Sequence, residues 1–296
     1  MHNAQLLRSC FRRWGWVIEG LSVFFLVAVL IRCSHERGGL GGAESGLAPG
    51  KTKTALVLGG VGVASFASLG VLKRLEEFGI EPDFIVTTGW PTFFALGYAA
   101  RMSFNDLEWL TLVRLSPDDW NSMAGFSPPH DEAPYDLFPD ALRVAFSPLP
   151  WDRLRTSVVV VHVPLDRDAS DFTTSGSWNT NLARALVTPG LSKASVTRTH
   201  WDHLQPIPVQ EALRLGARRI LLVSMYDDCV GELARRQPAL APYAYSVQQH
   251  SREELRKSPY AVSIRVPGGC LGWASRRKAI HEGYRAAARI IRWWQQ

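Results

Sequence analysis

The segment that decides the fold runs from Thr54 to Ala100 and reads TALVLGGVGVASFASLGVLKRLEEFGIEPDFIVTTGWPTFFALGYAA. It opens with a short, continuous apolar run at 55–58, which is typical of a buried parallel strand. Leucines at helical spacing, with charged residues between them, then predict a helix over 63–78. A second apolar run at 84–87 and a second helical stretch at 93–100 repeat this order. The segment therefore predicts a strand–helix–strand–helix unit within a parallel sheet.

The same alternation continues along the rest of the chain. We expect further strands at 157–163, 219–224 and 261–266, and further helices at 106–114, 137–146, 181–187, 209–215, 251–257 and 276–294. Alternating strands and helices with short connections indicate an α/β fold, a mostly parallel sheet with helices on both faces. The proline-rich stretch at 116–150 is expected to be an irregular, cap-like excursion from this pattern.

The first fifty residues differ in composition from the rest. An apolar run at 14–31 follows several arginines, which is the pattern of a membrane anchor helix or a signal peptide. We favour an uncleaved anchor, because no small-residue cleavage site follows directly, and we favour an extracytoplasmic position for the domain. The tract GGLGGAESGLAPG at 38–50 is typical of a flexible linker. We therefore expect an anchor or signal segment at 1–37, a linker at 38–50 and one folded domain at 51–296.

The composition is that of an ordinary globular chain. Its 296 residues carry a formal net charge of +6 and are 46% hydrophobic, which excludes low-complexity disorder and a polytopic membrane protein. The basic balance suggests contact with anionic surfaces but does not indicate nucleic acid. The four cysteines contain no C-x-x-C pair, so neither a zinc site nor a dense disulfide framework is indicated. We expect no metal and no cofactor. The sequence identifies no protein partner.

Two strand-to-helix turns can carry chemistry, because ligands of α/β proteins bind at the carboxyl ends of the strands. The first turn is the glycine loop Gly59-Gly60-Val61-Gly62, whose amides at a helix start would suit an anion or an oxyanion. Tight packing explains such a loop equally well. The second turn is TTGWP at 87–91, where a nucleophile elbow would sit. An elbow presents a serine hydroxyl beside amide donors, and this turn has no serine.

The segment 54–100 resembles the opening of a patatin-like phospholipase domain, in which a glycine-rich loop follows the first strand and a G-x-S-x-G elbow follows the second. The likeness continues in four downstream blocks: Val158–Pro164, Leu182–Ala185 with Thr188-Pro189-Gly190, Pro206–Val209 with Leu215–Ile220, and Gly283–Ala287. The resemblance implies a patatin-like fold over about 51–291. It also implies an ancestral serine–aspartate acyl hydrolase whose oxyanion-type loop would contain Gly59, Gly60 and Gly62.

The residues that such an enzyme needs are missing here. Aligned without gaps, the nucleophile position is Gly89, and Thr87 and Pro91 replace the elbow glycines. The aspartate position is taken by His200, and Asp202 would fit only if its loop were two residues shorter. We therefore expect a catalytically degenerate acyl hydrolase, a pseudoenzyme at a membrane with a lipid-binding or scaffolding role. Its expected partner is lipid or a membrane surface.

An active esterase or phospholipase with a shifted nucleophile is the alternative. Thr88 would attack and Asp202 would act as its base. However, Thr88 is β-branched and precedes the elbow position, so we expect its side chain to point away from the pocket. The cluster His200, Asp202 and His203 contains three potential metal ligands, but a loop with three ligands and no fourth is more often hydrogen bonded than metal-bound.

Two further segments have an ordinary structural interpretation. Asp227 and Asp228 follow a predicted strand and are interpreted as a solvated loop. The C-terminal helix is basic and ends in Trp293 and Trp294, so it either contacts anionic headgroups or packs on the sheet with a solvated basic face.

Overall fold

A computed structural model describes residues 52–123, 140–146, 153–164, 171–175, 181, 182, 185, 198, 199, 206–227, 229–236, 238, 241–266 and 272–295. They belong to one compact unit, Thr52–Gln296. The expected anchor and linker lie outside the described residues, and so does the candidate base Asp202. In the described part of the chain, no helix is both long enough and apolar enough to cross a membrane.

The centre of the fold is a seven-stranded sheet in which the strands follow the order β4-β3-β2-β1-β6-β7, with β5 also paired to β3. Five strands run parallel: β1 (Lys53–Gly60), β2 (Phe84–Gly89), β3 (Ser157–Pro164), β6 (Ala217–Met225) and β7 (Ala261–Ser263). Two short strands, β4 (Asp171–Thr173) and β5 (Arg198–Thr199), run antiparallel to β3. The predicted α/β class with a mostly parallel sheet is confirmed.

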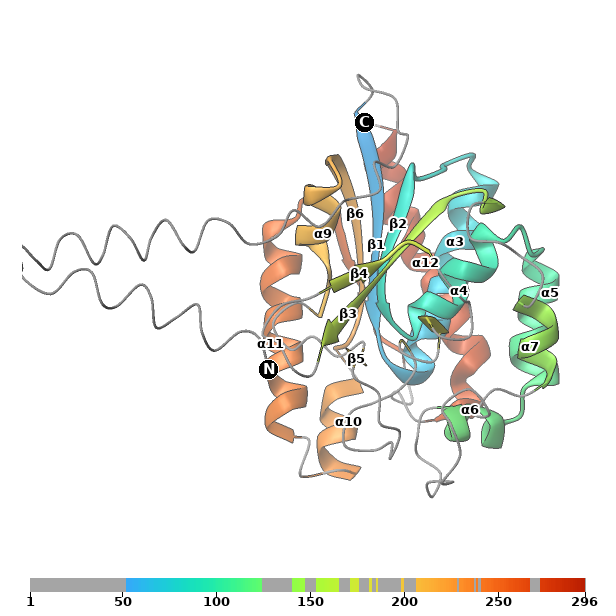
Figure 1. Ribbon diagram of the computed structural model, residues 1–296. Coiled ribbons are helices and arrows are strands. Elements are labelled where there is room, and N and C mark those ends of the chain that lie inside the picture. Colours follow the sequence, from blue (N-terminus) through green and yellow to red (C-terminus); the bar gives the residue numbers. More distant parts are fainter. Residues whose placement is uncertain are drawn as a thin grey trace, which may run out of the picture. The chain divides into compact units, whose positions relative to one another are not determined.

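Helices lie on both faces of this sheet (Figure 1). One face carries α3 (Ala67–Glu77), α4 (Pro91–Ala99) and α12 (Arg276–Trp294), and the other carries α9 (Val209–Arg214) and α11 (Ala241–Lys257). Shorter elements complete the fold: η1 (Gly62–Phe66), α5 (Phe104–Trp109), the π-helical turn η2 (Leu110–Arg114), α6 (Pro117–Met123), α7 (Asp140–Phe146), α10 (Cys229–Arg236) and η5 (Trp273–Ser275). The strands β2 and β3 follow β1 on one side of it, over the face that carries α3 and α4. The strands β6 and β7 lie on the other side of β1, so the direction of the strand order reverses between β1 and β6.

The predicted elements differ from the observed ones mainly where the sequence is polar. The C-terminal helix has the predicted bounds, whereas the helix predicted at 251–257 begins ten residues earlier, at Ala241. The helix α10 is not among the predicted elements. The helix predicted at 106–114 begins at Phe104, because the Ser103 hydroxyl accepts a hydrogen bond from the Asp106 amide at 3.1 Å and so caps it.

The helices α3 and α12 approach so closely that their backbones touch. A Cβ atom on Gly70 would lie 1.9 Å from the carbonyl oxygen of Ile280, and one on Gly283 would lie 2.0 Å from that of Ala67. Both distances are far shorter than any non-bonded contact, so only glycine fits at either position. The C-terminal helix is thereby locked to the helix that follows the glycine loop.

An arginine ties the start of β3 to the helices at the amino end of the sheet. The Arg155 guanidinium lies 4.3 Å above the Tyr98 ring and donates to the Tyr98 hydroxyl at 2.5 Å. It also forms ion pairs with Glu76 at 2.9 Å and with Glu81 at 3.2 Å. Tyr98 is buried, and burial raises its pKa above the ordinary 10.0, partly opposed by the nearby guanidinium.

This tyrosine should make stability depend on pH in the alkaline range. Because its pKa is higher in the folded chain, its contribution is fully present below the unfolded pKa of about 10 and is lost as the pH rises through the folded pKa. We expect the free energy of unfolding to fall above about pH 10, and Tyr98→Phe to make that fall less steep. Urea unfolding of both chains between about pH 8 and 11 measures this. Equal slopes for the two chains would contradict the assignment.

Candidate functional site

The two turns singled out from the sequence meet at the carboxyl edge of the sheet. In the parallel pairing of β1 with β2, Gly59 is opposite Thr88 and Gly60 is opposite Gly89. The glycine loop continues into η1 at Gly62. Six residues are predicted from the sequence as candidates for the nucleophile position, its alternative or the oxyanion-type loop. The structure brings five of them together, all buried: Gly59, Gly60, Gly62, Thr88 and Gly89. The sixth, Asp202, lies outside the described residues.

Gly89 has the backbone of a sharp strand-to-helix turn. It is the last residue of β2, and its φ of 72° lies in the left-handed region that strains any residue with a Cβ atom. Trp90 and Pro91 follow and start α4, and the Thr87 and Thr92 hydroxyls lie 3.4 Å apart across the turn. A nucleophile elbow is likewise a sharp, strained turn from a strand into a helix. The position that would carry the nucleophile has no side chain.

The Thr88 side chain points to the face of the sheet opposite the one that Gly89 faces. Side chains alternate along a strand, so Thr88 and Gly89 point to opposite faces. Thr88 shares a row with Gly59, and the face above Gly59 is covered by Pro206 and Ile207, just before α9. The Thr88 side chain is fully buried. This agrees with the expectation that it points away from the elbow.

The chain itself fills the crevice beside the glycine loop. A Cβ atom on Gly59 would lie 2.7 Å from the carbonyl oxygen of Pro206, which accepts a hydrogen bond from the Tyr226 hydroxyl at 3.0 Å. The Cys229 thiol donates to the Val61 carbonyl at 3.3 Å. These contacts lie where the strand order reverses, the usual ligand position in open α/β sheets. They give Gly59 a packing role.

A cluster of buried aromatic rings packs beyond the elbow on the face of α3 and α4. We define the aromatic cluster as Phe66, Trp90, Phe93, Phe94, Trp120, Phe146 and Trp273, each at most 5% exposed. Trp90, directly after the elbow glycine, has its ring centre 5.6 Å from that of Trp120 and 5.5 Å from that of Trp273. The rings of Trp120 and Trp273 stack at 5.8 Å. Side chains therefore occupy the space next to the nucleophile position.

Arg276 fastens the segment that carries Trp120 to the start of α12. Its guanidinium donates to the carbonyl oxygens of Thr111 at 3.0 Å and Leu115 at 2.8 Å, and the Trp120 indole donates to the same Thr111 oxygen at 3.3 Å. Partial burial lowers the Arg276 pKa. The expected irregular excursion after residue 116 thus begins with a helix, α6, that contributes to the core.

A buried hydroxyl outside the residues predicted as nucleophiles lies beside the glycine loop. Ser65 Oγ is 3.2 Å from the point that a Cβ atom on Gly60 would occupy. It has no hydrogen-bond partner among the described residues, so no carboxylate in that part of the chain activates it. Hydroxyl–carboxylate bonds that the described residues do form include those of Ser103 with Asp106 and of Ser116 with Asp119, both at helix starts.

The interpretation of Asp227 as a solvated residue is wrong. Its carboxylate accepts from Ser263 Oγ at 2.5 Å and from Arg252 Nε at 3.1 Å, so it joins the ends of β6 and β7 to α11. The neighbouring Asp228 and the His200–His203 cluster lie outside the described residues. Within the residues that the structure describes, no group of three His, Cys, Asp or Glu side chains could hold a metal ion.

The C-terminal tryptophans pack on the domain. The Trp293 ring lies 6.1 Å from that of Tyr260, and the Arg219 guanidinium lies 5.2 Å from the centre of the Trp294 ring. Both indoles contact the edge of the core. Of the two interpretations of this helix, packing on the sheet therefore holds for its tryptophans.

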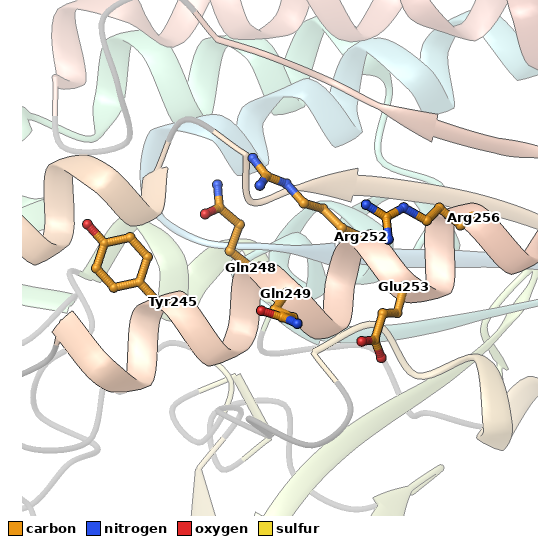
Figure 2. A pocket seen from close by; sticks show the side chains of 6 residues that line it. All are labelled: Tyr245, Gln248, Gln249, Arg252, Glu253 and Arg256. Atoms are coloured by element: carbon orange, nitrogen blue, oxygen red, sulfur yellow. The ribbon is translucent and has the colours of Figure 1, made fainter.

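Several shallow grooves are lined by described residues, and they lie away from the elbow. One runs along the exposed side of α11 and has a volume of about 450 Å³. Figure 2 shows its lining side chains, all from this single helix: Tyr245, Gln248, Gln249, Arg252, Glu253 and Arg256. Another lies between α5 and α12, and a third lies at the ends of β6 and β7.

No family model matches the chain, and a search of curated proteins finds no match. What the fold and the site define is an α/β protein with a mostly parallel sheet. The elbow-like turn has Gly89 at its centre, next to the glycine loop that follows β1, and Gly89 and the loop glycines are buried.

Proposed function

We propose that this chain is a catalytically inactive protein of the patatin-like acyl hydrolase fold that acts at a membrane as a scaffold or lipid-binding protein. The observation that carries the proposal is Gly89. It ends the second strand with a φ of 72°, beside Gly60 of the glycine loop, at the point where the family resemblance requires a serine. The turn has the shape that presents a nucleophile and lacks the nucleophile.

The surroundings of Gly89 support a role other than turnover. Hydrolysis of an ester needs room for the acyl group and amide donors aimed at the oxyanion. Trp90 and its aromatic neighbours occupy one side of the elbow, and Pro206 covers Gly59 on the other. Pro91 also removes one amide donor from the start of α4. Close packing of the described residues on both sides of the elbow suits a protein that presents a stable surface.

The membrane part of the proposal is supported by the sequence. The apolar run at 14–31 has the length and the basic flank of an anchor, and the net charge of +6 favours anionic surfaces. We propose a single N-terminal anchor with the domain on the extracytoplasmic side, and lipid or a membrane surface as the partner.

An assay of the full chain tests the catalytic part. In detergent, and on phospholipid vesicles, we expect no release of product from short p-nitrophenyl esters or from phospholipids above the protein-free rate. The matched variants are Thr88→Val, which removes a hydroxyl and keeps the shape, and Asp202→Asn. Turnover that is lost in these variants would instead establish the shifted-nucleophile alternative.

Fractionation tests the membrane part separately. The full chain should remain with membranes after an alkaline wash, and a chain without residues 1–37 should be released by it. A full chain that is released under the same wash would contradict the anchor, whatever the outcome of the catalytic assay.

A further inference from the structure

A groove of about 530 Å³ lies at the carboxyl ends of β6 and β7, next to α12. The charged and hydroxyl side chains that line it are Asp227, Ser263, Arg265, Glu282, Arg285 and Arg289. The groove is over β6 and β7, whereas the elbow is over β1 and β2, so the two sites are separate.

The strand wall of the groove follows from side-chain alternation. Beyond β7 the chain stays close to β6, because the Ile264 amide donates to the Ser224 carbonyl at 2.8 Å. Ile264 and Val266 are buried, while Ser263 and Arg265 alternate with them and lie on the face of the sheet that α11 covers, since Ser263 is paired with Ser224 and Ser224 bonds to Ser251. Both also line the groove with residues of α12, so the groove reaches around β7, the last strand in the order. Two buried apolar neighbours therefore fix the backbone of Arg265 at the edge of the groove.

The helix wall follows from helical spacing. Glu282, Arg285 and Arg289 are separated by three and four residues, so they lie on one face of α12. Gly283 and Ala287 are buried on the other side of the helix. Two arginines one turn apart thus face the groove together with Arg265.

The carboxylates in the groove already have cationic partners. Asp227 pairs with Arg252 at 3.1 Å, and Glu282 pairs with Arg285. Arg265 and Arg289 have no ion-pair partner among the residues that the structure describes. The three arginines and two carboxylates that line the groove give it a net charge of +1, and its concave shape concentrates the field of Arg265 and Arg289.

We propose that this groove binds a phosphate monoester. A phosphate monoester carries up to two negative charges near neutral pH, which matches the two guanidinium groups without an ion pair to any described residue, and a guanidinium can donate two parallel hydrogen bonds to phosphate oxygens. The carboxyl ends of parallel strands are also where α/β proteins commonly bind ligands. The monoester belongs either to a lipid headgroup or to a small phosphorylated molecule. The inference does not rest on the proposed function.

Calorimetric titration of the full chain in neutral detergent tests this inference. The probes are inorganic phosphate, glycerol 3-phosphate and dihexanoyl phosphatidic acid, with dihexanoyl phosphatidylcholine as a ligand without a monoester. Arg265→Gln with Arg289→Gln should weaken binding of the monoester probes by about tenfold or more. The control pair Arg256→Gln with Arg277→Gln removes the same charge from exposed positions elsewhere and should change the dissociation constant by less than about twofold.

The probes also separate the two sources of the monoester. If phosphatidic acid binds about tenfold more tightly than glycerol 3-phosphate, the groove takes a lipid headgroup, and similar affinities indicate a small phosphorylated molecule. Three results would overturn the proposal: no saturable binding of any monoester below about 10 mM, equal binding of phosphatidylcholine, or equal weakening by the control pair.

Discussion

Gly283→Ala is expected to lower the free energy of unfolding by about 3 kcal/mol. The added methyl group would lie 2.0 Å from the backbone carbonyl oxygen of Ala67, and backbone cannot yield as a side-chain end can. Relief requires α3 and α12 to move apart, which also opens the facing contact between Gly70 and Ile280. Chemical unfolding of the full chain in detergent gives the free energy directly.

Gly231→Ala is the matched control for that substitution. Gly231 lies within α10, and a Cβ atom there would have no atom within 4 Å. Since alanine is the better helix former, we expect a stabilisation of about 0.5–1 kcal/mol. Equal effects of the two substitutions would contradict the close approach of α3 and α12.

Trp120→Ala is the second substitution with a large expected effect. Trp120 is fully buried, and its ring contacts those of Phe66, Trp90, Phe93 and Trp273. Its removal should destabilise the chain by about 3–5 kcal/mol, through lost burial and through the cavity left behind. Such a cavity is apolar, so added indole should restore part of the lost melting temperature by binding only the folded chain.

Trp109→Ala serves as its control. The Trp109 side chain is 54% exposed, and the Arg114 guanidinium lies 5.3 Å from the centre of its ring. We expect a loss of less than about 1 kcal/mol and no response to indole. If Trp120→Ala were as mild as Trp109→Ala, the packing that closes the side of the elbow would be contradicted.

The fold could be predicted where the signal is local. The apolar run at 55–58 indicates a buried strand without any knowledge of its neighbours, and 276–294 shows helical periodicity over its whole length. The start of α11 at Ala241 cannot be predicted from the sequence, because residues 241–250 are polar and aromatic without a clear apolar stripe. Gly70 and Gly283 show best where prediction from the sequence ends. Helix propensity says only that a glycine weakens a helix, and the need for glycine at these positions depends on the backbone of the partner helix.

The positions of the candidate site residues could be predicted from the sequence, whereas the side chains that pack around them could be predicted only in part. Gly89 was placed at the elbow by counting residues, and its positive φ is consistent with that placement. The packing of described side chains beside the elbow could not be predicted, because the rings of the aromatic cluster come from five separate segments. Asp227 was misinterpreted because its partner Ser263 is 36 residues further along the chain.

The most direct test of the central claim is the intact mass of the full chain after treatment with a fluorophosphonate, which forms a stable adduct with activated hydroxyl nucleophiles. We expect the mass to remain that of the unmodified chain under conditions in which a serine hydrolase is labelled completely. A stoichiometric adduct mapped to Thr88 or Ser65 would contradict the account, because it would show that a hydroxyl at this edge of the sheet is activated for attack.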